Sequence, residues 1–539
     1  MANQACPDVM GSLTFDNRYT RELPADPDPD NNRRQVYGAC YSRVKPTKVF
    51  SPKLVAYSRE AAALLDLSKE CCESDSFTQI FSGNRLTPQM DSYANCYGGH
   101  QFGNWAGQLG DGRAINIGEV VNRHSNRFLL QLKGSGPTPY SRNADGLAVL
   151  RSSIREFLCS EAMYHLGVPT TRALSLILTG EQVERDMFYD GHPRMEPGAI
   201  VCRVAPSFTR FGNFEILAFR NDIKVLKKLL DYTMQTDFQF LGEPSAKDYI
   251  DWFEQVCQLT AQMVVHWMRV GFVHGVMNTD NMSVLGLTID YGPYGWLEDY
   301  NPDWTPNTTD AGTKRYCFGN QPGIAHWNLN KLANAIYPLI GKTDPLEQAL
   351  EQYAHIFQGE WNSMMAKKLG LSAYEPESDK ELFKALLLLL SLVETDMTIF
   401  FRNLAQLDIQ ENNFNDKAFD LMQSPLYKAY YIPEQITPAY QSRLLNWLTA
   451  YGKRAVRDKL SPKKRVDLMN AVNPKYVLRN YLAQLSIDKA EQGDFCMIEK
   501  LLELLRHPYD DQPDMEIYAK RRPDWARHKP GCSMLSCSS

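Results

Sequence analysis

Residues 274–292, HGVMNTDNMSVLGLTIDYG, combine side chains that can bind a metal ion beside a phosphate group. Asn281 and Asp290 offer hard oxygen ligands, and Mg²⁺ often takes only one or two such side chains when phosphates supply the rest. An Asx turn in NTDN, residues 278–281, and an ordinary strand-end aspartate at position 290 are the simpler alternative. Because a predicted short hairpin separates the two residues, we favour the metal site.

The order of these residues is similar to that of a kinase active site, with one difference. Kinases carry the pattern H-R-D-x-x-x-x-N, in which the aspartate is the catalytic base. Val276 occupies that position here and cannot accept a proton, whereas Asp280 stands directly before Asn281. We therefore predict Asp280 as the candidate base. These residues therefore indicate either an inactive kinase or a kinase-like enzyme that catalyses a different reaction.

Two charged residues upstream fit a site of this kind. Lys133 ends the predicted strand LLQLK, where it could pair with nucleotide phosphates, although a lysine that ends an edge strand is commonly only solvated. Glu156 lies near the start of the next predicted helix and could orient that lysine. Alternatively, Ser153 and Glu156 form an S-x-x-E capping box. The order of lysine strand and glutamate helix favours the ion pair.

A glycine-rich segment and further cations could also hold phosphates. In residues 97–119, closely spaced glycines let backbone amides approach an anion, and Arg113 adds a positive charge. Asp145, in the sequence ADG, could contact a nucleotide or stand in a plain turn. Arg203 and Arg210 flank a Pro-containing turn, and two guanidinium groups can cup one phosphate. Two surface arginines are the alternative.

The elements that must position these residues follow from hydrophobic periodicity. Residues 114–121 and 127–134 alternate as strands around a polar turn, which predicts a hairpin. A helix predicted over 151–169 separates this hairpin from further strands at 172–180 and 199–205. The first half of the chain is therefore predicted to be rich in strands.

The second half is predicted to be mostly helical. Residues 248–272 form a long amphipathic helix that leads into His274, residues 283–290 are predicted as a pair of short strands, and helical patterns run from 323 to about 505. A strand-rich half with a glycine-rich loop, followed by a helical half that begins with a catalytic-type loop, is the order of an α+β, protein-kinase-like bilobal fold.

We expect five segments along the chain. They are an N-terminal arm with a short helix packed on the core (1–90), an N-lobe with the glycine-rich loop (91–206), a C-lobe segment with the catalytic and metal-binding residues (207–322), a helical C-terminal region (323–510) and an irregular tail (511–539).

Composition narrows the classes of function. The 539 residues carry a formal net charge of −5, so no nucleic-acid partner is expected. The longest apolar run, 385–393, is too short to span a bilayer, so no membrane association is expected. The first residues lack a secretory signal, which favours the cytoplasm. Cys532 and Cys537 lie in a small polar tail, where we expect mobile, exposed thiols that are either a frayed end or redox-active.

Over nearly its whole length the chain resembles the selenoprotein O family, the YdiU-type proteins. The matching segments include LTFDNRYTRELP, YGGHQFGNWAGQLGDGRA, VCRVAPSFTRFGNFE, GFVHGVMNTDNMSVLGLTIDYGPYGWLEDYNP, FGNQPGIAHWNL and NPKYVLRN. The resemblance implies a pseudokinase fold that binds ATP in a flipped orientation and, with Mg²⁺, transfers AMP to Ser, Thr or Tyr hydroxyl groups of proteins. Mn²⁺-dependent UMP transfer is attributed to bacterial members.

The resemblance also implies roles for matching residues. Asp280 is the proton acceptor, Asn281 and Asp290 bind Mg²⁺, and Glu156 orients Lys133. The residues expected to contact ATP are Gly110, Gly112, Arg113, Lys133, Asp145, Gly146, Arg203, Arg210 and Asp290.

The C-terminal tail matches the family at CSS. Relatives carry selenocysteine or cysteine there, and some join it to a cysteine of the activation loop. Cys537 is present here, but the loop position that aligns is Pro306. The nearest loop cysteine is Cys317, so Cys537 pairs with Cys317, with Cys532 or with neither.

Two other functions are kept as alternatives. A protein or small-molecule kinase is one, and Val276 argues against it. A nucleotide-binding scaffold without catalysis is the other, and the full set of Lys133, Glu156, Asn281 and Asp290 argues against it because a scaffold does not need every metal-binding group.

Overall fold

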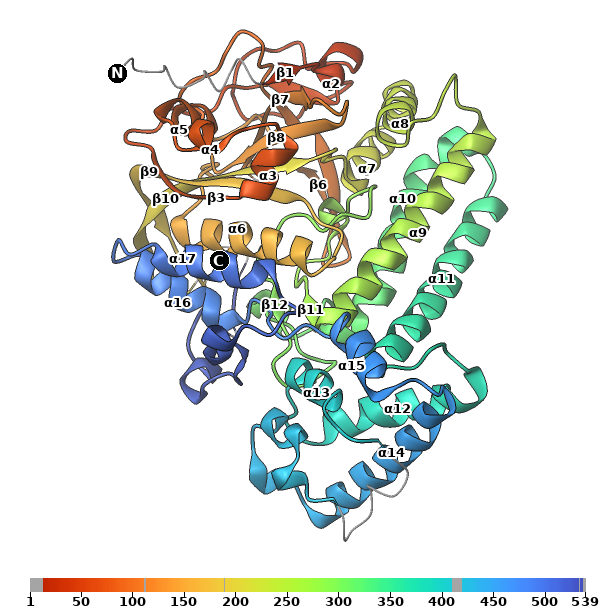
Figure 1. Ribbon diagram of the computed structural model, residues 1–539. Helices are drawn as coiled ribbons and strands as arrows, with labels where there is room; N and C mark the ends of the chain where they lie inside the picture. The colour runs from red at the N-terminus through yellow and green to blue at the C-terminus, as the bar shows by residue number, and fades with distance from the viewer. Residues whose placement is uncertain (1–12, 111–112, 189, 410–418, 533, 537–539) are drawn as a thin grey trace.

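The computed structural model describes residues 13–110, 113–188, 190–409, 419–532 and 534–536. Figure 1 shows a strand-rich part built from the first 205 residues and a larger helical part built from the rest, joined along the middle of the molecule. The protein is therefore a mixed α/β structure with antiparallel sheets and many helices.

The main sheet of the described residues has eight antiparallel strands. Seven lie in the order β2, β4, β7, β8, β10, β9, β3, and β1 pairs with β7. Two smaller hairpins, β5–β6 and β11–β12, stand apart from it. The strand bounds are β1 Thr14–Phe15, β2 Tyr41–Arg43, β3 Lys53–Tyr57, β4 Tyr93–Asn95, β5 Tyr97–Gln101, β6 Asn104–Leu109, β7 Ala114–Val121, β8 Arg127–Lys133, β9 Arg172–Arg185, β10 Arg194–Ala205, β11 Phe272–Val273 and β12 Gly295–Trp296.

The predicted hairpin is confirmed as β7 and β8, with Ala114 opposite Lys133. β8 also pairs with β10, where Val201 stands opposite Lys133. Lys133 therefore ends an interior strand of the sheet, so the alternative of a solvated lysine on an edge strand is wrong. An interior position holds the lysine between two paired neighbours and limits where its side chain can point.

Helices surround the sheet and form most of the remainder. In the strand-rich part they are α2 Arg18–Glu22, α3 Arg59–Leu64, α4 Lys69–Cys72, α5 Asp75–Phe81 and α6 Leu150–His165. In the helical part they are α7 Phe211–Phe219, α8 Ile223–Asp237, α9 Ala246–Val270, α10 Gln321–Ile340, α11 Asp344–Lys368, α12 Pro376–Leu392, α13 Met397–Leu404, α14 Pro438–Arg457, α15 Pro462–Asn470, α16 Asn480–Ala490 and α17 Cys496–Arg506.

Helix α6 lies between the sheet and the end of the chain. It packs on β9 and β10, and α16 and α17 return from the C-terminal region to cover it (Figure 1). Most of its residues are therefore buried, charged ones included, among them Arg155, Glu156 and Glu161. An isolated charge away from water is costly; Glu156 and Glu161 form ion pairs, and Arg155 donates to the carbonyl of Tyr294 at 2.6 Å and lies over its ring.

Helix α9 confirms the long helix predicted before the catalytic-type loop. Ser245 and Asp248 form a reciprocal capping box at its start. At its end Gly271 adopts a left-handed backbone with φ of 76°, which an L-residue with a side chain adopts only with strain. The chain then enters β11 and reaches His274, whose Nε2 contacts the carbonyl oxygen of Ile289 at 2.9 Å.

Two expectations about local structure need correction. Residues 283–290 are not a pair of strands that bond to each other: Ser283 bridges to Arg210 and Thr288 bridges to Thr170. The main-chain groups of this segment are taken by distant partners, which periodicity cannot reveal. In addition, residues 1–90 hold more than an arm and a helix, because β1, β2 and β3 join the main sheet. The five segment boundaries remain predictions.

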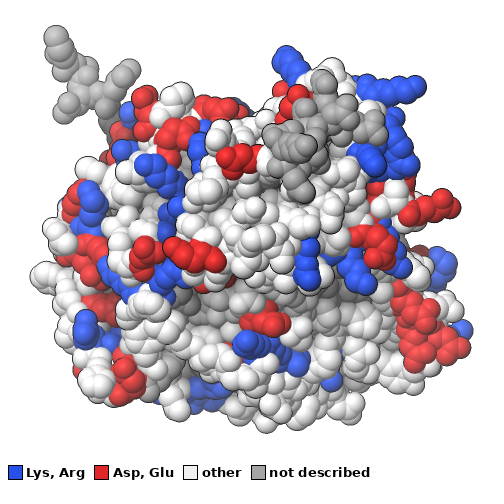
Figure 2. Space-filling model, turned by 90° about the horizontal axis from the view of Figure 1, so that it is seen from below, with Lys and Arg blue, Asp and Glu red and all other residues white. Residues whose placement is uncertain are grey.

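No helix in the described residues is long and apolar enough to cross a membrane. Figure 2 shows the molecule from below, where Lys and Arg side chains are interspersed with Asp and Glu among many uncharged ones.

Candidate active site

A cavity of about 190 Å³ brings five of the predicted residues together. Its lining includes Lys133 from β8, Asp280 and Asn281 from the 3₁₀ turn Thr279–Asn281, and Asp290 just beyond it. Arg113 lines it as well. Residues more than 150 positions apart in the sequence thus share one charged cavity.

Asp290 stands at the centre of the charge cluster. Its two carboxylate oxygens accept hydrogen bonds from Arg203 and Arg210, each at 2.5 Å. Burial alone would raise the pKa of Asp290, but Arg210 and Arg203, with help from Lys133, hold it well below its usual range. The carboxylate is therefore ionised at any physiological pH. Asp290 also has a positive φ of 55°, an unusual backbone for a non-glycine residue.

The pairing of Lys133 with Glu156 is present. Lys133 Nζ contacts one oxygen of Glu156, and Arg203 contacts the other at 3.1 Å. The capping box proposed as an alternative is absent, because α6 begins at Leu150 and Ser153 lies inside its first turn. Glu156 thus links the lysine to the arginine pair around Asp290.

The two arginines are buried rather than on the surface. Arg203 lies near the end of β10, and Arg210 lies at the start of α7. The guanidinium of Arg210 also donates to the carbonyl of Asp280 at 2.8 Å. The Nε atom of each arginine is buried without a hydrogen-bond partner among the described residues. An unpaired buried donor is costly, so each arginine has a hydrogen bond to spare for an anion.

Asp280 is in a different electrostatic state from Asp290. Burial raises the pKa of Asp280 to about 7; Arg210 opposes this shift and the Asp290 carboxylate adds to it. Gln101 Nε2 lies 3.4 Å from Asp280 Oδ2, while Oδ1 is buried and has no partner in the described part of the chain. A carboxylate with a pKa near neutrality and one unpaired oxygen is suited to accept a proton.

The β5–β6 hairpin covers this aspartate, which our sequence reasoning missed. The backbone amide of His100 donates to Thr279 Oγ1 at 2.7 Å, and Gln101 reaches Asp280. The His100 ring in turn contacts the Glu215 carboxylate of α7 at 2.5 Å. The sequence predicts only phosphate binding for the glycine-rich segment. The pair His100-Gln101, directly after two glycines, is the sequence feature that indicates its contact with the turn of Asp280.

A methyl group at Gly99 should therefore disturb the candidate base. A Cβ there would lie 2.7 Å from Asp280 Oδ1 and 3.1 Å from its backbone nitrogen. We expect Gly99→Ala to shift Asp280 and lower the rate of the nucleotide transfer that the resemblance implies by about 100-fold, because displacements of about 1 Å carry such costs. Gly323→Ala, where a Cβ meets nothing within 4 Å, is the control. Equal activity of both variants, measured by nucleotide incorporation, would contradict the packing described.

The donor set at the cavity fits Mg²⁺. Asp280, Asn281 and Asp290 supply hard oxygen atoms. The side-chain amide nitrogen of Asn281 donates to the carbonyl of Val276 at 2.9 Å, which leaves the amide oxygen to face a cation. Each oxygen of Asp290 retains a second lone pair beside the arginine bond. These features of Asn281 and Asp290 match a small, hard cation.

Other residues predicted to contact the nucleotide have structural roles nearby. A Cβ at Gly110 would lie 2.0 Å from the Tyr140 side chain. A Cβ at Gly146, whose φ is 75°, would lie 2.2 Å from the backbone of Gly136. Asp145 is held by both terminal nitrogens of Arg185, at 2.7 and 2.8 Å. These contacts neither require nor exclude a nucleotide. Gly112 lies outside the described residues.

The cysteine expectations change in part. Cys532 is buried, not mobile and exposed as expected, and Cys317 is buried too; both are free thiols. The tail is held in place because Leu535 forms a parallel bridge with Asn307, and its amide donates to the carbonyl of Pro306 at 2.9 Å. Cys537 lies outside the described residues.

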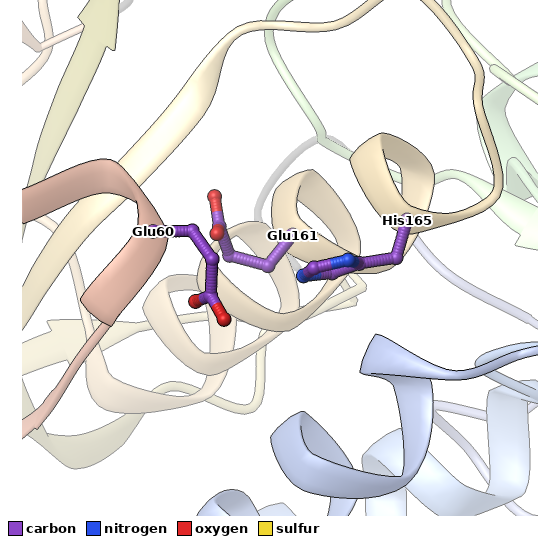
Figure 3. Close-up of side chains that lie close together, drawn as sticks. All are labelled: Glu60, Glu161 and His165. Carbon is purple, nitrogen blue, oxygen red and sulfur yellow. The ribbon is translucent and has the colours of Figure 1, made fainter. Parts of the chain in front are cut away.

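A second group of side chains has the right types for a metal (Figure 3). Ligand atoms of Glu60, Glu161 and His165 all lie within 4.8 Å of one another. However, Arg172 donates to both oxygens of Glu161, at 2.9 and 2.6 Å, and Arg506 donates to Glu60 at 2.8 Å. Each oxygen of Glu161 also accepts a second hydrogen bond, from the Ala173 amide at 3.0 Å and from the Ser58 hydroxyl, so neither keeps a lone pair for a cation as the oxygens of Asp290 do. We therefore assign this group to ion pairs that tie α3, α6, β9 and α17 together.

The fold and the cavity define a class: a mixed α/β protein with a lysine–glutamate pair, two buried arginines and an oxygen-rich metal-type site. The pattern of the family described as "Protein adenylyltransferase SelO" matches residues 31–506, and the chain belongs to this family. Similar proteins called "Protein nucleotidyltransferase YdiU" occur in Rhodopirellula baltica, 60% identical over 98% of this chain and 99% of the relative, and in Aromatoleum aromaticum, 58% identical over 98% and 100%. One from Flavobacterium johnsoniae is 55% identical over 98% and 100%.

Proposed function

We propose that the chain is a protein nucleotidyltransferase that moves AMP from ATP to Ser, Thr or Tyr hydroxyl groups of proteins. Family membership over most of the chain supports this activity. The observation that carries it is the cluster at Asp290, where three cations converge and the candidate base stands at Asp280 instead of position 276. The fold we propose is the bilobal pseudokinase fold, with the cavity between its lobes.

In the proposed reaction, the substrate hydroxyl oxygen bonds to the α-phosphorus of ATP while the bond from that phosphorus to the bridging oxygen breaks. Pyrophosphate leaves, and the hydroxyl proton goes to Asp280. Lys133, Arg203 and Arg210 supply three positive charges for the phosphates that depart. Mg²⁺ held by Asn281 and Asp290 would neutralise charge on the phosphate oxygens.

The arginines support pyrophosphate as the leaving group. In AMP transfer the leaving group is pyrophosphate, whose negative charge lies at the γ end of the nucleotide. In phosphoryl transfer the leaving group is ADP, so cations at the γ end fit a departing pyrophosphate better. Arg203 and Arg210 each retain a buried donor without a partner in the described residues. Val276 removes the base of a kinase, which disfavours phosphoryl transfer. We also propose a cytoplasmic location, which the ten free cysteines of the described residues support.

Intact-mass measurement tests the proposal. The protein and a panel of candidate protein substrates are incubated with ATP and Mg²⁺ or Mn²⁺, and in a parallel reaction with UTP and Mn²⁺. We expect the mass of AMP to be added with ATP and pyrophosphate to be released. Addition of a phosphate would instead identify a kinase, and addition of UMP alone would identify a uridylyltransferase. No mass change on any protein with any nucleotide and metal would favour the scaffold and overturn the proposal.

A further inference from the structure

A groove far from the candidate active site runs between α12 and α14, at the lower end of the molecule in Figure 1. It encloses about 880 Å³. Its floor is apolar and includes Leu382, Leu389 and Trp447. Leu388 and Leu392, on the α12 side of the groove, are 60% and 43% exposed, although leucine side chains are more often buried in the protein interior. A surface of this kind marks an interaction site.

The two helices present matching stripes to the groove. On α12 the lining residues are Ser378, Glu381, Leu382, Ala385, Leu388, Leu389 and Leu392; on α14 they are Arg443, Asn446, Trp447, Ala450, Lys453, Arg454 and Arg457. Both sets recur at helical spacing of three and four residues. The helices are antiparallel, since Asp379 near the start of α12 pairs with Arg454 near the end of α14 at 2.7 Å. Two such stripes form the surface into which a third helix packs.

The groove has room for the side chains of an incoming helix. Ala385 and Ala450 line it, and larger side chains at these positions would fill the space. The exposed stripe from Glu381 to Leu392 spans twelve residues, or about 16 Å along the axis. A helix of about three to four turns would therefore cover the groove and bury Leu388 and Leu392.

Charge selects among possible occupants. Arg443, Lys453 and Arg457 form a basic edge along α14, whereas Glu381 is the acidic residue of the lining. Arg457 pairs with Glu375 at 2.8 Å, but no described carboxylate lies within ion-pair distance of Arg443 or Lys453. A second copy of this chain that docked through the same groove would bring three more cations against one carboxylate. An acidic partner fits this edge better.

We infer that the groove between α12 and α14 docks an amphipathic helix with an apolar face and an acidic edge, carried by a protein that the enzyme modifies. The identity of the partner as a substrate rests on the proposed function, whereas the binding itself does not. Docking remote from the chemistry raises the effective concentration of a substrate at the active site without contact to the reacting hydroxyl.

The test uses a fluorescent helical peptide of about 15 residues, with leucines at helical spacing, glutamates on both flanks and no hydroxyl side chain. We expect saturable binding to the full chain with a micromolar Kd by fluorescence anisotropy. Peptides in which lysine replaces glutamate, or glutamine replaces leucine, should bind at least about tenfold more weakly. Leu388→Glu should weaken binding to a similar extent, while Leu241→Glu, at a position 91% exposed elsewhere, should not.

Charge reversal and oligomeric state complete the test. The double variant Arg443→Glu, Lys453→Glu should prefer the lysine peptide. Equal binding of all peptides, or unchanged binding in Leu388→Glu, would overturn the inference. A wild-type dimer that becomes monomeric in Leu388→Glu would instead make the groove a contact between copies. AMP transfer to the panel of candidate protein substrates is assayed on the same preparations: peptide binding without transfer to any of them overturns the proposed function alone, and transfer without peptide binding overturns the docking site alone.

Discussion

Replacement of Asp290 by alanine is expected to abolish AMP transfer, with a loss of about 1000-fold or more in rate. Losing one preorganised electrostatic group at a reacting phosphate commonly costs about 100- to 1000-fold. Asp290 is both a candidate Mg²⁺ ligand and the anion that holds Arg203 and Arg210 in place. Its removal therefore affects the metal and the cations together.

The same substitution should also destabilise the fold. It leaves two buried guanidinium groups next to each other without their shared carboxylate, and removal of one partner from a buried ion pair costs about 3–5 kcal/mol. Asn281→Ala provides the matched comparison. Asn281 makes one side-chain hydrogen bond, to Val276, so its loss should remove a metal ligand with a smaller fall in Tm.

Transfer is measured by intact mass over a range of Mg²⁺ and Mn²⁺ concentrations, with Tm recorded for each variant. We expect Asn281→Ala to need more metal and Asp290→Ala to remain inactive at any concentration. A transferred AMP in Asp290→Ala, or a metal requirement in Asn281→Ala equal to that of the wild type, would show that the metal assignment is wrong.

Asp280→Asn is expected to lower the transfer rate by about 100- to 10,000-fold, the range for loss of a general base. In the wild type the rate should rise with pH through about 7, because Asp280 must lose its proton before it can accept one. Asparagine has the same shape but cannot titrate. The residual rate of the variant should therefore lack this pH dependence.

The variant should at the same time be more stable above neutral pH. The folded pKa of Asp280, about 7, lies above the ordinary value of 3.8, so the folded state binds the proton more tightly. Stability of the wild type therefore falls as pH rises from about 4 to about 7, by roughly 4 kcal/mol from this group. Asp280→Asn removes that fall, and its Tm at pH 8 should exceed that of the wild type.

Asp237 on α8 offers a matched control. Burial raises the pKa of Asp237 to about 7 as well, but this residue is not among those that line the candidate active site. Asp237→Asn should show the same gain in stability above neutral pH while it keeps full activity and the wild-type pH profile. If Asp280→Asn remained as active as Asp237→Asn, Asp280 would not be the base, and another proton acceptor would have to be sought.

Much of the fold could be predicted from sequence where local pattern decides structure. Alternation with a polar turn predicted the β7–β8 hairpin, and one amphipathic stripe predicted α9. The strand pair predicted at 283–290 is wrong because the segment bonds to distant parts of the chain: Val284 N donates to the carbonyl of Thr209, and Thr288 N to that of Pro169. The burial of Cys532 was missed for the same reason, since the polar tail docks on the loop at Asn307.

The sequence by itself determined which chemistry is available: carboxylate and amide oxygens near position 280, a lysine at a strand end, two arginines around a turn, and a valine where a kinase has its base. The tertiary structure alone decided how these groups share charge. Arg203 and Arg210 both bind Asp290 and keep it ionised, whereas burial under the β5–β6 hairpin raises the pKa of Asp280 to about 7. A pKa depends on distance and solvent exclusion, and both are set by segments that lie far apart in the chain.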